Sequence, residues 1–479
     1  MRHLKVLMGL VFSVSFFIFP HDSGAQNKHS DLYGYFSKTK NAKPDSLTLS
    51  EQWEAFALEE GKGRSERPKP YRPSYAFTHE TGTSFQIDTS GESVSQLFRP
   101  VPKDDATEQD IEETIAELRS IEILFYGLEQ SIHIPVEYGS FHPEGLDEND
   151  VASFWNELDR YDYRTIIKEY SILAAANGYN DWTAYKWVRK VSEAIFPQNI
   201  NCEQEIFSSF ILTKIGLLCR IARISNRLGL MFASSQKVYA KRYITVGDMP
   251  YYLAEDEVVG NKVYTYRTSP SSEARPFDMR ISKSPRFGSG NTFHFKKYSS
   301  ILERDIETEI STGLLSFYED YPQVDVVVYA SGAKETTFSK DLLRCFDKCT
   351  DGLGKTESVN LLLKYVQADF EYDNDFDQFG REKPMFCEEC YFYSGNDCED
   401  RCVVFSFLVS NLLKMKVILL DYGDHVCTAV RLDGNDATGA FVSREDGKYY
   451  VCDPTFIGAS VGMIIPDYRS RKPKVIDLN

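Results

Sequence analysis

The chain has 479 residues, a formal net charge of −17 and an aromatic content of 14%. A surface this acidic repels the phosphates of nucleic acids and anionic lipids, so we expect neither nucleic acid nor a membrane surface as a partner. The aromatic content indicates folded cores rather than disorder, and the length favours roughly two to four domains.

The N-terminus has the layout of a secretory signal peptide. A short basic stretch, MRHLK, precedes an apolar run of 14 residues from 6 to 19, which is short for a membrane span. Pro20 breaks the run, and small residues offer a cleavage site after Ala25. We therefore predict a signal peptide over residues 1–25 and an exported protein, periplasmic or extracellular, with no membrane span after cleavage. An uncleaved anchor is the alternative.

Residues 26–149 are predicted to form an N-terminal segment with a linker and β elements. The linker is the Pro- and Arg-rich stretch GRSERPKPYRPS. Alternating apolar and polar residues predict strands at 84–88 and 122–138.

Residues 150–312 form a predicted middle region, helical at first and then β. One helix of this region should begin at Asn180–Asp181 and stop at Pro197, because these residues are typical helix start and stop signals. Strand-like sequence follows at 237–268 and near 293–297.

Residues 313–479 form the last predicted domain. The valine-rich run 324–331 predicts a strand, and the amphipathic spacing of 358–372 predicts a helix. The stretch that begins at Cys398, CEDRCVVFSFLV, is apolar nearly all round, so we expect a helix buried inside the domain.

Cys398 occupies the start of this predicted buried helix. Asp397 is a suitable N-cap, and Asp400 at the third helical position completes a capping-box pattern. The unsatisfied N–H groups of a helix N-terminus are expected to lower the pKa of a thiol at this place and to favour the nucleophilic thiolate. A structural or disulfide-bonded cysteine is the alternative, since paired cysteines are common in exported proteins.

A base and an orienting carboxylate follow Cys398 in the sequence. Among eight histidines, only His425 lies beyond residue 294, and it begins a predicted strand. Asp453 ends another predicted strand, and antiparallel pairing would place the start of one strand beside the end of the other. We therefore predict that His425 lies within hydrogen-bond reach of Asp453, roughly 3 Å, and faces the Cys398 thiol within about 4 Å. The order Cys–His–Asp fits nucleophile, base and orienter.

The motifs DCEDR, a strand-initial histidine and YYVCDPT resemble the transglutaminase-like superfamily of papain-like fold, as found in exported bacterial proteins. The resemblance covers about residues 355–460 and implies Cys398 as nucleophile, His425 as base and Asp453 as orienter. It also implies Gln378, in a long loop before the helix, as a second oxyanion donor. The fold class implied is α+β: a C-terminal transglutaminase-like domain, with a buried helix on an antiparallel sheet, after mixed helical and β domains.

The predicted function is that of an exported cysteine-dependent acyl-transfer enzyme acting on peptide or isopeptide amides. A thioester on Cys398 could be resolved by water, as in a peptidase or amidase, or by an amine, as in a crosslinking enzyme. The residues do not decide between these acceptors, and hydrolysis is the favoured prediction. The substrate would be a protein or a cell-wall peptide, with no cofactor and no metal. The alternative is a non-catalytic binding or scaffold protein of the cell envelope, because a fold does not guarantee an activity.

The cysteines of this region also allow a metal site as an alternative interpretation. Cys387, Cys390, Cys398 and Cys402 could form a four-cysteine zinc site, although the seven residues between the two pairs are few for such a cluster. We instead expect Cys402, Cys427 and Cys452 to be buried, reduced packing residues, and Cys387 and Cys390 to be those most readily oxidised.

A short segment of the middle region is weakly similar in sequence to a segment of the last domain. NCEQEIFSSFIL, from Asn201, is similar to DCEDRCVVFSFL, from Asp397. Either one helical unit occurs twice, or two buried helix starts are similar by chance. Because no histidine lies between Cys202 and Phe293, a second copy would lack its base. The sequence therefore predicts at most a degenerate, non-catalytic repeat.

Overall fold

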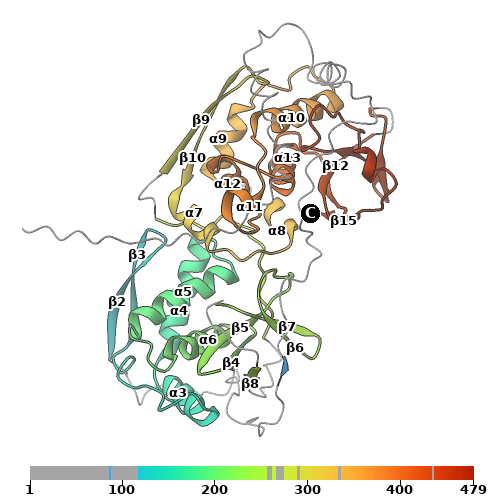
Figure 1. Cartoon of the computed structure of the whole chain (residues 1–479). Helices are drawn as coiled ribbons and strands as arrows, with labels where there is room; N and C mark the ends of the chain where they lie inside the picture. Colours follow the sequence, from blue (N-terminus) through green and yellow to red (C-terminus); the bar gives the residue numbers. More distant parts are fainter. Residues whose placement is uncertain are drawn as a thin grey trace, which may run out of the picture. The chain divides into compact units, whose positions relative to one another are not determined.

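The computed structural model describes residues 86–87, 117–255, 262–265, 274–288, 292–332, 336–433 and 436–478. The described residues form a mixed α+β structure, as predicted, with eleven α-helices and mostly antiparallel sheets (Figure 1). The predicted signal peptide and the linker lie outside these ranges. No helix within them is long and apolar enough to cross a membrane.

The first part of the fold is a β-hairpin followed by helices. Tyr126 and Gly127, both at positive φ, form the turn of the hairpin, so the predicted single strand at 122–138 is in fact two strands. The Asn180 side chain caps its helix by accepting from the Thr183 N–H at 3.0 Å, and the helix ends before Pro197, as predicted. The elements are β2 (Leu118–Phe125), β3 (Leu128–Pro135), α3 (Glu148–Arg160), α4 (Tyr163–Asn177), α5 (Asp181–Ile195) and α6 (Glu203–Ile215).

The strands β4 to β8 follow α6 and form a sheet with β1, in the strand order β1-β8-β4-β5-β7-β6. Neighbouring strands are antiparallel, except that β1 runs parallel to β8. The predicted strand at 84–88 thus appears as β1. The strands are β1 (Gln86–Ile87), β4 (Cys219–Ile224), β5 (Arg227–Ala233), β6 (Tyr243–Val246), β7 (Met249–Leu253) and β8 (Lys262–Thr265).

A second hairpin and a second set of helices come next. The elements are β9 (Thr292–Ser299), β10 (Arg304–Ser311), α7 (Thr312–Glu319), α8 (Val326–Ala330), α9 (Thr337–Cys345), α10 (Lys355–Asp369), α11 (Asp375–Phe379), α12 (Cys387–Phe392) and α13 (Cys398–Leu412). β9 and α10 fall where strand 293–297 and helix 358–372 were predicted, and the long loop before Cys398 contains the short helices α11 and α12.

The prediction of a strand at 324–331 is wrong, because this run forms the short helix α8. Val326, Val328 and Tyr329 are buried in it. The Tyr329 hydroxyl donates to the Pro322 carbonyl at 3.1 Å and so closes the chain into a compact turn. Tertiary packing here overrides the β-propensity of the three valines.

The last sheet has the strand order β13-β14-β12-β11-β15, and every neighbouring pair is antiparallel. Its strands are β11 (Val417–Asp421), β12 (Val426–Leu432), β13 (Phe441–Arg444), β14 (Gly447–Cys452) and β15 (Lys474–Asp477). The helix α13 packs on β11 and β12, and Figure 1 shows it beside β12. Its residues from Cys398 to Val409 are all buried.

The two halves of the described chain repeat one topology. We name residues 118–265 the first repeat and 292–477 the second repeat. Each starts with a hairpin, continues through helices to a central helix, α6 or α13, and ends in a sheet on which that helix packs. In chain order the sheet strands β4 to β8 match β11 to β15 position by position. The predicted boundaries at 149/150 and 312/313 fall in the first turn of α3 and of α7, the first helix after the hairpin of each repeat.

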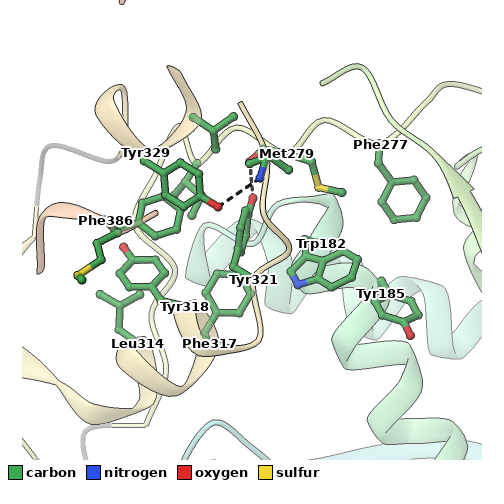
Figure 2. Packing of buried hydrophobic residues seen from close by; sticks show 14 of the residues in the cluster. Trp182, Tyr185, Phe277, Met279, Leu314, Phe317, Tyr318, Tyr321, Tyr329 and Phe386 are labelled. Atoms are coloured by element: carbon green, nitrogen blue, oxygen red, sulfur yellow. Dashed lines mark hydrogen bonds between the residues drawn. The ribbon is translucent and has the colours of Figure 1, made fainter. Parts of the chain in front are cut away.

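One hydrophobic core runs through both repeats. Figure 2 shows part of it, with Trp182 of α5 close to Tyr321, which follows α7, and to Phe317 of α7. The Tyr321 hydroxyl bonds to the Met279 carbonyl, and Asn180 Nδ2 donates to the same hydroxyl at 2.8 Å. Buried aromatic rings with their polar atoms satisfied therefore connect the repeats.

Candidate active site

The pairing of β12 with β14 brings His425 and Asp453 together. Thr428 lies opposite Cys452 in the antiparallel ladder, so the residue before β12 meets the residue after β14. His425 Nε2 lies 2.8 Å from Asp453 Oδ2, and both residues are buried. The predicted histidine–aspartate contact is confirmed.

The second oxygen of Asp453 is held by the turn that follows it. Asp453 Oδ1 accepts from the Thr455 N–H at 3.0 Å, from the Thr455 hydroxyl at 2.6 Å and from the Phe456 N–H at 3.2 Å. Burial alone would raise the pKa of Asp453, but the His425 charge and the hydrogen bonds from His425 and Thr455 outweigh it and lower that pKa. The carboxylate is thus kept ionised beside the imidazole.

Two further residues position this pair. Gln367 of α10 donates from Nε2 to the carbonyls of Asp453, Phe456 and Ala459 at 2.9–3.2 Å, which ties the turn to the helix. The Tyr468 ring stacks on the His425 ring with centroids 5.0 Å apart. Sequence reasoning missed both. A glutamine between apolar positions of α10 was a signal for the first, but nothing local pointed to the second.

Cys398 is the first residue of α13, as predicted. The N-cap residue Asp397 donates its N–H to Asp400 Oδ2 at 3.3 Å, which is half of the expected capping box. The thiol is buried and lies against the backbone N–H of Val426, the residue that follows His425. The fold therefore brings the nucleophile candidate to the end of β12 at which the base candidate stands.

The predicted lowering of the Cys398 thiol pKa is wrong, because the structure raises it. Burial is the largest cause, followed by the negative charges of Glu399 and Asp397 and a hydrogen bond to Glu399. A helix N-terminus contributes about 0.3–1 kcal/mol, less than one pKa unit. Full burial can shift a pKa by about 3–5 units, so burial wins.

The thiol in this structure points its proton at Glu399. Cys398 Sγ donates to Glu399 Oε2 at 3.0 Å, whereas within the described residues no hydrogen bond connects the thiol to His425. The predicted approach of His425 to the thiol within about 4 Å stays a prediction. Since Nε2 of His425 is engaged by Asp453, Nδ1 is the ring nitrogen left for the thiol.

Gln378 lies on α11 close to the segment before Cys398. Its Oε1 accepts from the Gly395 N–H at 3.0 Å, and its Nε2 donates to the Gly395 carbonyl at 3.4 Å. Both ends of the amide thus bind the chain three residues before the thiol. A role as oxyanion donor stays a prediction and would require Nε2 to leave the weaker of these bonds.

A group of carboxyls surrounds the start of α13. The side-chain oxygens of Asp375, Asp397 and Asp400 lie within 4.8 Å of one another, and all three residues are buried. Glu399 and Glu382 form a further group with Asp375. Burial, followed by repulsion from Asp397, raises the pKa of both Asp375 and Asp400. Protons shared among these carboxyls relieve the repulsion near neutral pH.

The four cysteines of the zinc alternative do not gather into one group of ligand atoms among the described residues. Among the described residues, no group of close metal-ligating atoms contains two cysteines. Cys387 and Cys390 lie on α12, and the Cys390 thiol donates to the Asp400 carbonyl at 3.7 Å. Cys402, Cys427 and Cys452 are buried, as predicted. All ten cysteines are free thiols, so the expected oxidation of Cys387 and Cys390 is not seen in this structure.

The chain matches no family model, no curated protein and no solved structure.

Replacing Glu399 by Gln should make the Cys398 thiol more reactive. The substitution replaces the closest negative charge, whose carboxylate accepts the thiol proton, by a neutral amide, so the thiol pKa should fall. We expect the iodoacetamide rate at Cys398 to rise about threefold or more near pH 7.5, with its pH profile displaced to lower pH. Mass mapping of the labelled cysteine gives the rate, and the exposed Glu445→Gln variant is the control. An unchanged profile would contradict the role given to Glu399.

Replacing Asp375 by Asn should flatten the dependence of stability on pH. The raised pKa means that Asp375 stabilises the fold below its ordinary pKa and loses this contribution as pH rises through the folded value. Asn keeps an acceptor for the Lys383 N–H, which lies 2.6 Å from Asp375 Oδ2. We expect a melting temperature roughly 2 °C or more above that of the parent at pH 8 and a smaller difference at pH 4.5.

The matched control for this variant is Asp377→Asn, an exposed change on the same helix α11. Parallel curves of melting temperature against pH for the parent and the Asp375 variant would contradict the proposed repulsion among the carboxyls.

Proposed function

We propose that the protein is a cysteine-dependent acyl-transfer enzyme that acts on peptide or isopeptide amides, with Cys398 as nucleophile, His425 as base and Asp453 as orienter. The observation that carries the proposal is the buried 2.8 Å contact between His425 and Asp453, formed where the Cys398 helix meets β12. Burying a carboxylate costs folding free energy unless its charge is compensated or serves a function, such as the orientation of an imidazole.

The reaction would begin from the protonated thiol. Rotation about the side chain of Cys398 moves the sulfur from Glu399 to Nδ1 of His425, which takes the proton while Asp453 stabilises the imidazolium. The thiolate attacks the amide carbonyl, and N–H groups of the first turn of α13 would stabilise the oxyanion. His425 then returns the proton to the leaving amine, and the thioester remains on Cys398.

Resolution of the thioester by water would complete a peptidase or amidase cycle. The Cys398 side chain is 3% exposed, so water, the smallest acceptor, reaches it more readily than a lysine of a second protein. This supports hydrolysis over crosslinking. With the predicted signal peptide, the proposed substrates are proteins or cell-wall peptides outside the cytoplasm.

A non-catalytic binding or scaffold role is the second candidate, and one observation favours it. The thiol is buried and bonded to Glu399, and its pKa is raised, as expected for a packing cysteine. The two candidates differ in whether His425 can activate this thiol.

Covalent trapping should separate the two candidates. A peptide electrophile such as a vinyl sulfone should label wild-type protein at Cys398, and Cys398→Ala should lose this label while keeping its melting temperature within about 2 °C. The control is Cys349→Ala, which removes a half-buried thiol outside the site. Labelling that maps to another cysteine, or to none, would favour the binding role.

Replacing Asp453 by Asn should slow this labelling without abolishing it. The variant keeps the shape of the side chain but removes the charge that stabilises the imidazolium. We expect a loss of about tenfold or more in the labelling rate at pH 7, because positioned acid–base partners contribute roughly 10²–10⁴ in rate. Time courses at several pH values give the measurement. The exposed Asp446→Asn variant should react like the parent, and equal rates for all three proteins would remove Asp453 from the mechanism.

A further inference from the structure

The first repeat contains a counterpart of each residue of the candidate site. Cys202 stands directly before α6, and its sulfur accepts from the N–H of Leu228 in β5 at 3.3 Å. Cys398, at the start of α13, has its sulfur against the N–H of Val426 in β12. Each thiol therefore meets the backbone at the beginning of the corresponding strand. The residue one position earlier is His425 in the second repeat and Arg227 in the first.

Strand register identifies the third counterpart. Two residues beyond Val426, Thr428 lies opposite Cys452, and Asp453 comes next. Two residues beyond Leu228, Leu230 accepts from the Ala254 N–H at 2.9 Å, and Glu255 comes next.

The separation along the chain agrees with this register. His425 and Asp453 are 28 residues apart, and Arg227 and Glu255 have the same separation. The positions of Cys398, His425 and Asp453 are thus occupied by Cys202, Arg227 and Glu255.

These three residues line one cavity of about 840 Å³. Arg189, Gln204 and Asn226 also line it. The cavity therefore occupies, in the first repeat, the place that the candidate site occupies in the second. Its volume is in the range of pockets that bind small ligands or peptide side chains.

Most charges of this cavity are already paired. Arg189 lies 3.2 Å from Glu205, Lys190 lies 3.0 Å from Glu193 and Lys186 lies 3.3 Å from Asp320. The Glu255 carboxylate accepts from the hydroxyl of Tyr185.

Arg227 is different from these cations. Within the described residues it has no ion pair and no hydrogen bond to a side chain, and its charge acts on the Cys202 thiol. One uncommitted guanidinium thus lines the same cavity as the thiol, at the position that His425 occupies in the second repeat.

We propose that the first repeat is a binding site for a carboxylate-bearing peptide, with the carboxylate on Arg227 above Cys202. A guanidinium cannot accept a proton, so the base function is lost, but it binds a carboxylate through two parallel N–H bonds. Asn226 and Gln198, whose side chains have no partner among the described residues, are available for the peptide backbone. This site does not depend on chemistry at Cys398.

Peptide titration of the full chain tests the proposal. The protein carries Cys398→Ala, so that turnover cannot obscure binding and failure of the proposed enzyme activity is a separate result. The probes are acetyl-trialanine with a free C-terminal carboxylate, its C-terminal amide, and the amidated peptide acetyl-Ala-Glu-Ala. Ligand-observed NMR gives the affinities. The two acidic probes distinguish a chain-terminal carboxylate from a side-chain carboxylate.

We expect at least one acidic peptide to bind about tenfold or more tightly than the neutral amide, and Arg227→Gln to lower that affinity about tenfold or more. The control Arg160→Gln, an exposed arginine of α3 outside the cavity, should bind like the parent. Bound peptide should also protect Cys202 from maleimide, as mapped by mass.

Three results would overturn the proposal. These are equal affinities for acidic and neutral peptides, an Arg227 variant that binds like its control, and binding of inorganic phosphate without binding of either acidic peptide.

Discussion

The candidate site depends on the antiparallel register of β12 against β14. A slip of one residue would turn the side chains of β14 to the other face of the sheet and would part His425 from Asp453. Side-chain packing on both faces of β12 and β14 stabilises this register. Val430 and its partner Tyr450 belong to the core beneath α13, while Ala429 and its partner Val451 belong to the apolar cluster on the other side. Packing on two sides thus sets the distance between two polar groups at the end of the sheet.

Buried acids in this domain fall into two classes, according to their partners. Asp453 faces an imidazole, a hydroxyl and two N–H groups, and its pKa is lowered. Asp400 also accepts backbone N–H groups, but its closest charged neighbour is Asp397, and its pKa is raised. Both residues are aspartates, and both are buried. The sign of the nearest charge decides whether the carboxyl is ionised.

Local patterns predicted the helix start at Cys398 and the strand ends at His425 and Asp453, because capping and strand signals lie within a few residues of the positions that they determine. The strand predicted at 324–331 failed, since its valines form a short helix held by contacts to other segments. Gln367 was missed for a related reason, as the carbonyl of Asp453 that it binds lies 86 residues further along the chain. The thiol pKa was misjudged because a helix N-terminus is visible in sequence, whereas the burial and neighbouring charges that outweigh it are properties of the packed domain.

The two repeats show how one framework tolerates different charges at the same position. His425 is 5% exposed under the Tyr468 ring, and an imidazole paired with a carboxylate can be closed off from water at modest cost. Arg227 has no ion pair within the described residues, and burying an unpaired guanidinium would cost several kcal/mol. An unpaired Arg227 therefore needs the solvent exposure that the open cavity of the first repeat provides. Replacing the histidine position by arginine removes a base and, for the same electrostatic reason, requires the site to stay accessible to water or to an anion.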